Sequence, residues 1–410
     1  MALPSVLVVR ILHTSDWHLG RSFLGVGMLV HQAAFVDHLL ETVEEREVDL
    51  VVVPGDVYDR ALPPGEAVAL LERTLERLAD SRATAVLTSG NHDSALRLGF
   101  ASSLIARSGV HLRTDPAGVG TPVELTDEHG PVVVHALPYL DPDGLRQTWA
   151  LEERSHAAVL GEALRRVRAD LAARPGGTRS VLLAHAFVAD VAASEPRPEP
   201  DAGATRSDSE RDISVGGVEI APLSLFADLD YVALGHLHGR ATLSETVRYS
   251  GSPLAYSFSE AGHRKGSWLV DLGAGGVVRS EFVPSPVPRA LHRLRGTLDE
   301  LLDDPRHAPA EDGWVQAVLT DRVRPRQAKP RLEQRFPHLL SLAFEPAGAT
   351  ASAVPGASVT TGTSDRQVLL DFVRDVRGQD ADAAERSLLG EAVDAVGHDT
   401  VAVRDARVVR

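Results

Sequence analysis

Short aliphatic runs alternate with segments of helical periodicity along the first two thirds of the chain. Apolar positions that recur every three or four residues predict amphipathic helices over His31–Glu47 and Glu66–Ala79. The runs rich in Val, Leu, Ile and Ala predict buried β-strands at Val6–Leu12, Leu50–Val53, Ala85–Thr88, Val132–Ala136, Val181–Ala184 and Tyr231–Leu234. Strands that alternate with helices are typical of an α/β fold.

A Pro-rich segment at 282–289, FVPSPVPR, ends this pattern and predicts a domain boundary. The pattern after it predicts a small α+β domain, with strands at Ala290–Arg295, Val315–Thr320 and Leu339–Phe344 and helices at Leu298–Leu302 and Lys329–Arg335. We therefore expect four parts: residues 1–280, residues 281–345, residues 346–365 and residues 366–410.

The last two of these parts differ sharply in composition. Residues 346–365 are rich in Ala, Gly, Ser, Thr and Pro and lack large apolar side chains, which predicts a flexible linker. Amphipathic helices are expected beyond it, over Arg366–Arg374 and Ala383–Ala395. A pair of short helices buries little surface alone, so it either docks on the rest of the chain or binds a partner.

Composition and charge narrow the classes of function. The 410 residues carry a formal net charge of −15, which disfavours a protein that coats nucleic acid through general basicity. The chain has no Cys, so disulfides, Cys-ligated zinc, iron–sulfur clusters and thiol catalysis are excluded. No stretch reaches about 18 consecutive apolar residues, and the N-terminal apolar run lacks a basic start and a cleavage site. We expect a cytoplasmic protein without a membrane span.

Five clusters of polar residues follow the predicted strands. They contain Asp16 and His18, Asp56, Asn91 to Asp93, His185, and His236 with His238. Each cluster taken alone has an ordinary structural explanation, such as a turn residue or a hydrogen-bonded core histidine. Together they supply only carboxylate oxygens, an amide oxygen and imidazole nitrogens, a set that suits Mn, Fe or Zn.

The number of these residues favours a centre with two ions. The seven candidate ligands, Asp16, His18, Asp56, Asn91, His185, His236 and His238, are too many for one ion and suit two ions that share a bridging carboxylate. Two metals about 3.5–4 Å apart form a clamp for phosphoryl transfer, in which a metal-bound water attacks phosphorus in line. Such chemistry requires no Ser or Cys nucleophile.

The order of these motifs, D-x-H, G-D, G-N-H-D, H and G-H-x-H, resembles the calcineurin-like metallophosphoesterase superfamily, and more specifically the SbcD exonuclease subunit family. The resemblance is carried by ILHTSDWHLGR, VVVPGDVYDR, TSGNHD, LLAHAFV, SDSERDISVGG, YVALGHLHG and YSGSPLAYSFSE. It implies two packed β-sheets flanked by helices, a small α+β cap domain and C-terminal helices.

The resemblance also implies roles for individual residues. One metal would be held by Asp16, His18, Asp56 and His238, and the other by Asp56, Asn91, His185 and His236. His92 would contact the phosphate and protonate the leaving oxygen. Asp59, in GDVYDR, would orient His92 as the corresponding acid does in phosphoprotein phosphatases, or would be a solvated loop acid. Arg60 would contact phosphate or simply lie on the surface.

Three functions remain open at this point. The first is a manganese-dependent DNA nuclease subunit, with Mg²⁺ or another divalent ion as the alternative metal. It would act as an exonuclease on duplex ends and as an endonuclease on single strands or hairpins, in DNA recombination, repair and replication. The resemblance implies a nucleoid-associated heterotetramer, in which a homodimer of this chain binds an SbcC-type coiled-coil ATPase. His31–Glu47 is one candidate surface for the homodimer. The second is a phosphomonoesterase or phosphoprotein phosphatase on the same fold, and the third is a non-catalytic binding module.

Overall fold

The computed structural model describes residues 8–189, 220–347, 364–377 and 379–405. The stretch SDSERDISVGG and almost all of the predicted linker lie outside the described residues. The chain divides into two compact units, Met1–His292 with Asp312–Trp314, and Arg293–Glu311 with Val315–Arg410. The four-part division expected from the sequence stays a prediction.

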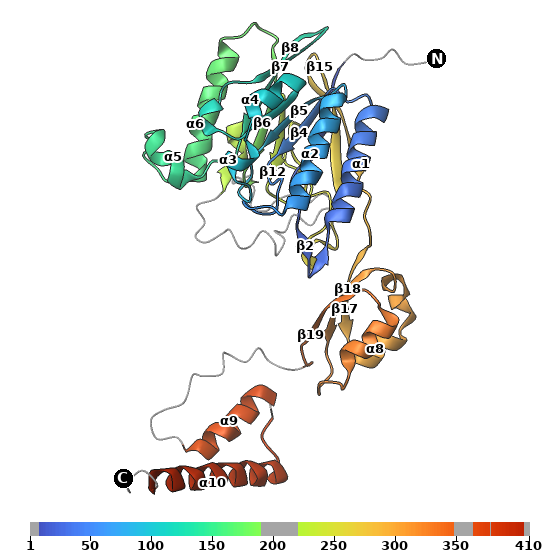
Figure 1. Ribbon diagram of the computed structural model, residues 1–410, viewed down its shortest axis with the longest axis vertical. Helices are drawn as coiled ribbons and strands as arrows, with labels where there is room; N and C mark the ends of the chain where they lie inside the picture. The colour runs from blue at the N-terminus through green and yellow to red at the C-terminus, as the bar shows by residue number, and fades with distance from the viewer. Residues whose placement is uncertain (1–7, 190–219, 348–363, 378, 406–410) are drawn as a thin grey trace. The chain divides into compact units, whose positions relative to one another are not determined.

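The first unit contains two six-stranded sheets (Figure 1). One sheet has the strand order β16-β15-β1-β4-β5-β6, with β1 at Val9–His13, β4 at Leu50–Pro54, β5 at Thr84–Thr88, β6 at Val110–Arg113, β15 at Gly266–Gly273 and β16 at Gly276–Pro284. The other has the order β13-β14-β12-β9-β8-β7, with β7 at Val123–Asp127, β8 at Gly130–Leu137, β9 at Arg179–His185, β12 at Tyr231–Gly235, β13 at Ala241–Thr242 and β14 at Val247–Tyr249. The central strands of both sheets pair in parallel.

Side chains of the central strands are buried on both faces, which explains their unbroken apolar sequences. In β4, Leu50 and Val52 face the core between the two sheets, whereas Val51 and Val53 face the helices. In β9, Val181 alternates in the same way with the residues that follow it. The period of two along a strand therefore lets each continuous run contribute to two apolar layers, and the strands of the two sheets together build three.

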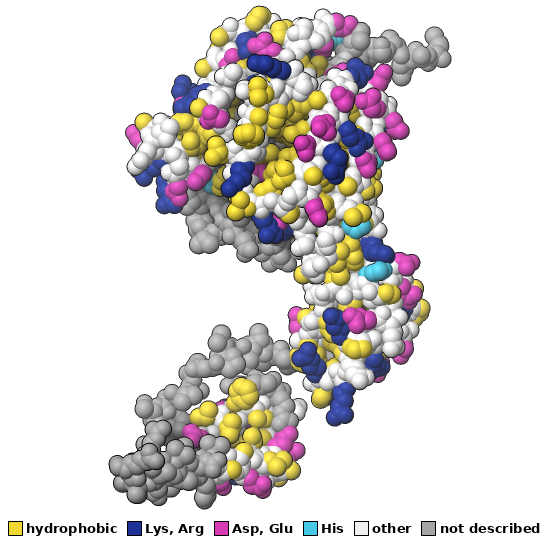
Figure 2. All heavy atoms as spheres, in the orientation of Figure 1, with side chains coloured by type: hydrophobic (Ala, Val, Ile, Leu, Met, Phe, Trp, Pro, Cys, Tyr) yellow, Lys and Arg dark blue, Asp and Glu magenta, His cyan; other side chains and the backbone are white. Residues whose placement is uncertain are grey.

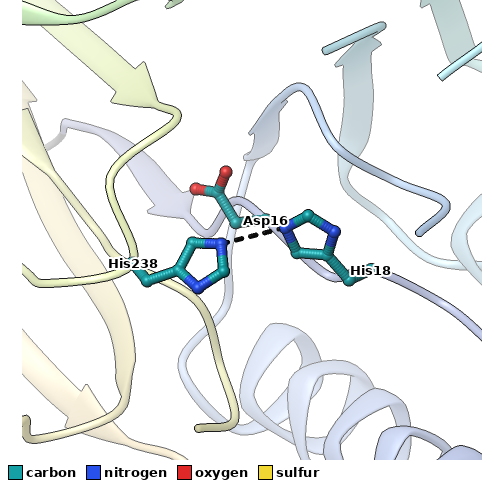
Figure 3. A group of neighbouring side chains, drawn as sticks. All are labelled: Asp16, His18 and His238. Carbon is teal, nitrogen blue, oxygen red and sulfur yellow. Dashed lines mark hydrogen bonds between the residues drawn. The ribbon is translucent and has the colours of Figure 1, made fainter. Parts of the chain in front are cut away.

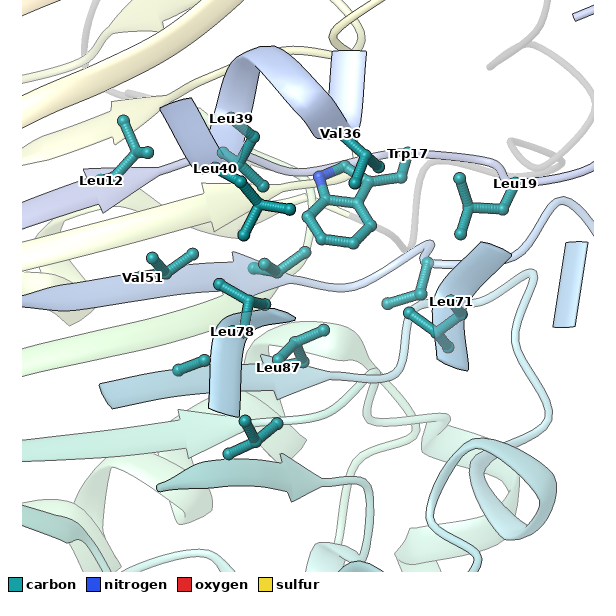
Figure 4. Packing of buried hydrophobic residues seen from close by; sticks show 14 of the residues in the cluster. Leu12, Trp17, Leu19, Val36, Leu39, Leu40, Val51, Leu71, Leu78 and Leu87 are labelled. Atoms are coloured by element: carbon teal, nitrogen blue, oxygen red, sulfur yellow. The ribbon is translucent and has the colours of Figure 1, made fainter. Parts of the chain in front are cut away.

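Helices cover the outer faces of the two sheets. The long ones are α1 (Leu29–Glu45) and α2 (Gly65–Asp80) on the first sheet, and α6 (His156–Ala172) on the second. Figure 4 shows Leu12 and Val51 of the strands packed toward Leu39 and Leu78 of the helices. This four-layer arrangement confirms the predicted fold class.

Shorter elements complete this unit. They are β2 (Ser22–Phe23), β3 (Val26–Gly27), α3 (Ala95–Leu98), α4 (Ser102–Ile105), α5 (Pro142–Thr148), β10 (Val188–Ala189) and β11 (Ala221–Pro222). The described part of β1 begins at Val9, and the two long helices predicted from periodicity begin one or two residues earlier than expected.

The second unit is built on a three-stranded sheet of order β17-β18-β19. Its elements are β17 (Leu291–Gly296), α7 (Leu298–Asp303), β18 (Trp314–Leu319), α8 (Ala328–Arg335) and β19 (Leu339–Phe344). A capping box between Thr297 and Glu300 starts α7, because each residue's side chain accepts the backbone N–H of the other. A cluster that includes Leu301, Leu332 and Phe336 forms the core, as expected for the predicted α+β domain.

Two further helices, α9 (Asp365–Arg377) and α10 (Ala383–Asp405), contact each other near the C-terminus. Both were expected from their amphipathic pattern, and both extend beyond the predicted ends. Among the described residues, no helix is long and apolar enough to cross a membrane.

Candidate metal centre

Polar residues from both sheets meet where the strands end. Asp16 and His18 follow β1, Asp56 follows β4 and Asn91 follows β5. In the second sheet His185 is the last residue of β9 and pairs with Gly235 of β12, which places His185 beside the start of the His236–His238 loop. Hydrogen bonds join the two groups, since the His236 N–H donates to the Asp16 carboxylate at 3.0 Å. All seven predicted ligands therefore converge, as expected for the carboxyl ends of neighbouring parallel strands.

Two histidines face each other on one side of this cluster. The Nε2 atoms of His18 and His238 are 3.0 Å apart, beside the Asp16 carboxylate (Figure 3). Nδ1 of His238 faces the Glu260 carboxylate at 3.2 Å. A carboxylate only accepts, so Nδ1 carries the proton and Nε2 of His238 presents a lone pair. Neutral imidazole nitrogens are common ligands of divalent cations, so two that face each other beside a carboxylate fit a shared cation.

On the other side of the cluster, hydrogen-bond acceptors also face one another. His185 donates from Nδ1 to the Pro54 carbonyl at 2.9 Å, which leaves Nε2 as an acceptor in the neutral ring. That Nε2 lies 2.9 Å from Oδ1 of Asn91, which is a second acceptor. The same Asn91 oxygen lies 3.2 Å from Nδ1 of His236. Protons or metal cations must occupy the space between such atoms.

Asp56 lies between the two groups. Its Oδ2 is 3.6 Å from Nε2 of His18 and 3.5 Å from Nε2 of His185. Its Oδ1 accepts the backbone N–H of His92 at 2.9 Å. One carboxylate oxygen thus faces ligands of both groups, which is the placement required of a bridging ligand. The assignment of each residue to one ion stays a prediction.

The backbone around these ligands adopts a conformation that side chains rarely allow. Among the described residues, Asp16, His18, Asp56 and His236 have φ values of 53°, 46°, 48° and 102°. Left-handed backbone at non-glycine residues costs about 1–3 kcal/mol each and concentrates at functional sites. Four of the seven candidate ligands carry this strain, which favours a functional explanation for the cluster.

His92 and Asp59 lie beside the metal-ligand cluster and are joined by a hydrogen bond. Nδ1 of His92 donates to the backbone carbonyl of Asp59 at 2.9 Å. The Asp59 carboxylate instead faces Nδ1 of His18 at 3.6 Å and Arg21 at 3.2 Å. The contact with His92 is thus made by the Asp59 main chain, whereas the Asp59 side chain points toward His18. A role for Asp59 in orienting His92 stays a prediction. The side chain of Arg60 is 65% exposed and lies 3.7 Å from the Asp59 carboxylate, so its contact with phosphate stays a prediction.

Comparison with protein families decides the identity of this unit. A family model described as calcineurin-like phosphoesterase matches residues 9–240, which is more than half of the chain. The chain belongs to the calcineurin-like phosphoesterase family. The SbcD C-terminal domain model, described as the type 5 capsule protein repressor C-terminal domain, matches residues 287–377. Both matches confirm the resemblance to the SbcD family noted from the sequence motifs.

Three of the solved structures that match this phosphoesterase share little of its sequence. They include TT1561 of Thermus thermophilus, with 14% identity over 68% of this chain and 99% of that one and a TM-score of 0.40. GAP50, described as the anchor in the inner membrane complex of Plasmodium, gives 14% identity over 68% and 85% of the two chains and a TM-score of 0.39. A dimetal phosphatase from Danio rerio gives 14% identity over 68% and 100% and a TM-score of 0.36.

Glycines allow the phosphoesterase ligands to approach one another. A Cβ atom added to Gly55, which has a φ of 83°, would lie 2.3 Å from Nδ1 of His185. One added to Gly90 would lie 2.1 Å from Oδ1 of Asp56, and one added to Gly235 would lie 1.9 Å from the Pro54 carbonyl oxygen. Glycine at these positions is thus required by packing around the ligands.

Gly90→Ala should therefore damage both folding and turnover. The new methyl group would displace the carboxylate and the backbone nitrogen of Asp56, at a cost of about 1–3 kcal/mol in the free energy of unfolding. Urea unfolding and a phosphodiester assay measure the two effects. The matched control is Gly161→Ala, in α6, where the added Cβ meets nothing within 4 Å and should leave turnover unchanged. Equal stability and equal turnover in the two variants would contradict this packing.

The electrostatics of the ligand cluster follow from burial and close charges. Burial raises the pKa of Asp16 to about 6. Burial alone would also raise the pKa of Asp56, but the charge and hydrogen bond of His185 outweigh it and hold that pKa well below its usual value. Burial opposes protonation of His185, yet the Asp56 carboxylate raises the pKa of this imidazole to about 9. Protons and metal cations therefore compete for the same ligand atoms.

Several residues that support the site were given no role from the sequence, although Asp93 belongs to one of the five polar clusters. Asp93 accepts the backbone N–H groups of Val57, Tyr58 and Gly90 at 2.8–3.0 Å and so ties two ligand loops together. Burial of its carboxyl group raises the pKa of Asp93 to about 7. Gln32, on α1, donates to the His18 carbonyl at 2.7 Å.

The sequence offered weak signals for these supporting residues. Tyr256, which donates to the Trp17 carbonyl, and Glu260 both lie within the GSPLAYSFSE stretch that carried the family resemblance. Gln32 is a polar residue among the apolar positions of a helix. None of these features says which partner the side chain meets.

Proposed function

We propose that this phosphoesterase is a two-metal DNA nuclease subunit, an exonuclease on duplex ends and an endonuclease on single strands and hairpins. It would act with an SbcC-type ATPase in DNA recombination and repair. The observation that carries the proposal is a complete set of seven ligands and His92 on a chain whose C-terminal region matches the SbcD domain. Membership of the family already implies a metal-dependent hydrolase, and the proposal adds the substrate.

The seven ligands would hold two cations for phosphodiester hydrolysis. Asp16, His18, Asp56 and His238 would hold one cation, and Asp56 with Asn91, His185 and His236 would hold the other. Bound divalent cations supply an activated water and charge stabilisation. Their oxygen and nitrogen donors suit Mn²⁺, which we propose as the metal.

His92 would act on the leaving group. Its Nδ1–H is occupied by the Asp59 carbonyl, so Nε2 is the nitrogen left to hold a phosphate oxygen or to transfer a proton. In the imidazolium form Nε2 carries the proton that the departing 3′ or 5′ oxygen requires. The Asp59 main chain fixes the ring, and we propose that Arg60 contacts the flanking phosphate through its exposed guanidinium.

The C-terminal helices are proposed to bind the ATPase. Phe372 of α9 and Leu388 of α10 are 54% and 65% exposed. In Figure 2 apolar side chains of this helical pair gather in a patch bordered by acidic ones. The acidic balance of the chain is compatible with a partner that supplies much of the affinity for DNA.

A homodimer has a candidate surface beside the site. Leu96, Phe100 and Leu104, in the α3–α4 segment, are 87%, 80% and 62% exposed. Leu62 is 66% exposed. Its neighbour Ala61 accepts a hydrogen bond from Arg97 of α3 through its carbonyl, which ties the Leu62 loop to α3. Such exposed apolar groups mark association sites. Helix α1, the candidate surface named from the sequence, exposes Val30 but buries Phe35 and Leu39 in the core, so we propose the contact on α3–α4 instead.

Phe100→Glu should dissociate this dimer without unfolding the chain. A charge in the centre of an apolar contact should weaken dimerisation at least about tenfold, whereas an exposed side chain contributes little to the stability of the monomer. Sedimentation equilibrium measures the change. Val323→Glu, at an 81% exposed position of the second unit, is the control. A wild-type chain that stays monomeric at micromolar concentration would refute the surface.

One assay tests the proposed function. Purified chain is incubated with Mn²⁺ and either end-labelled hairpin DNA or a small phosphomonoester, with and without the ATPase partner. Cleavage of DNA that disappears with chelator supports the proposal. Turnover of the phosphomonoester while DNA stays intact in the presence of the ATPase would instead favour a phosphatase.

A further inference from the structure

A buried ion pair lies behind one of the candidate metal ligands. Glu260 and Lys265 are 1% and 4% exposed, and Nζ of Lys265 lies 2.6 Å from Oε2 of Glu260. The other carboxylate oxygen, Oε1, accepts from Nδ1 of His238 at 3.2 Å. The two oxygens of one carboxylate therefore connect a buried ammonium group to the ring that faces His18.

We infer that Glu260 is a positioning residue that fixes the tautomer and orientation of His238 for metal binding. The inference rests on the two-metal centre proposed above and adds to it the group that prepares one ligand. Because a carboxylate cannot donate, the proton of the His238 ring is held on Nδ1 and the lone pair on Nε2. Nε2 is the atom 3.0 Å from Nε2 of His18. Partners of this kind, on the far side of a ligating imidazole, raise its basicity and fix its ring.

Lys265 makes this arrangement possible in a buried environment. A carboxylate without a positive partner would be too costly to bury here, and Lys265 supplies that partner. The same ammonium group donates to the His238 carbonyl at 2.8 Å and to the Ser252 hydroxyl at 2.9 Å. Lys265 thus holds the main chain of His238 while Glu260 holds its ring. The ion pair therefore contacts both the ring and the main chain of His238, as expected of a pair that positions this residue.

His238 is held more tightly than the histidine opposite it. The carboxylate nearest to Nδ1 of His18 belongs to Asp59, and it lies at 3.6 Å, beyond hydrogen-bond distance. At His238 the corresponding distance is 3.2 Å. His18 and His238 belong to the proposed ligand set of the same ion, and the other ion's proposed set does not include His238. Loss of Glu260 should weaken the ion that His238 would hold and leave the other ion in place.

The test is Mn²⁺ binding by the full chain, measured by calorimetric titration and by electron paramagnetic resonance. Wild type should bind two Mn²⁺ ions and give the spectrum of a coupled pair. Glu260→Gln should weaken one site by about 10–100-fold, leave the other unchanged and replace the coupled spectrum with that of an isolated ion at low Mn²⁺. Glu41→Gln, an exposed acid on α1, is the matched control.

A second variant separates positioning from folding. In Glu260→Leu with Lys265→Met, both charges are replaced by apolar groups of similar size, a change that buried ion pairs often tolerate. Loss of one Mn²⁺ site in this folded variant supports the inference, and two unchanged sites in either variant overturn it.

The same titration distinguishes this inference from the nuclease proposal. A wild-type chain that binds two Mn²⁺ ions but leaves DNA intact would contradict only the proposal that DNA is the substrate. A wild-type chain that binds no Mn²⁺ at all would overturn both.

Discussion

Asp56→Asn should remove nearly all turnover and one or both metal ions. Oδ2 of Asp56 faces His18 and His185 at 3.6 and 3.5 Å, so this one carboxylate oxygen lies between imidazoles of both groups. An amide keeps the shape but loses the negative charge, and its single oxygen cannot both bridge and accept the His92 N–H. We expect turnover to fall about a thousandfold or more, since electrostatic stabilisation of the transition state is lost.

Equilibrium dialysis with Mn²⁺ and a phosphodiester assay measure these two effects. Asp37→Asn is the control, because Asp37 pairs with Arg77 on the surface of the same unit and its side chain is 60% exposed. Unchanged Mn²⁺ stoichiometry together with an unchanged rate in Asp56→Asn would refute the site.

The fold could be predicted because its signal is local and repeated. The run Leu50–Val53 is short, rich in β-branched Val and apolar at every position, as expected of a strand buried on both faces. Helix α2 places Leu71 and Leu78 on the same face by the helical repeat, which is visible without any tertiary information. The ends of elements were less certain, by one or two residues in α1 and α2 and by ten at the end of α10. End residues are determined by capping and pairing.

The ligands of the site could also be predicted, because each follows an apolar strand. The carboxyl ends of neighbouring strands meet, so a polar cluster after each strand indicates a common site. The atom through which Asp59 contacts His92 could not be predicted. The atom that holds His92 is the backbone carbonyl of Asp59, and any residue supplies such a carbonyl. Glu260 lies 22 positions from His238, and only the tertiary structure brings the two together.

His92→Asn should separate chemistry from metal binding. The bond from the His92 backbone N–H to Asp56 is independent of the side chain, so the substitution leaves the bridging carboxylate in place. The asparagine amide can donate to the Asp59 carbonyl as Nδ1 does, but it has no titratable group at the position of Nε2. The leaving oxygen would then lack its proton donor, which should lower kcat about 10²–10⁴-fold.

The decisive comparison is between two substrates of this variant. A diester with a nitrophenolate leaving group needs no proton, so its hydrolysis by His92→Asn should fall much less than that of DNA, while both Mn²⁺ ions stay bound in the calorimetric titration. An equal loss on both substrates would mean that His92 binds the phosphate instead of protonating the leaving group. Loss of a metal ion would mean that His92 is itself a ligand, and the division of roles between His92 and the seven predicted ligands would then be wrong.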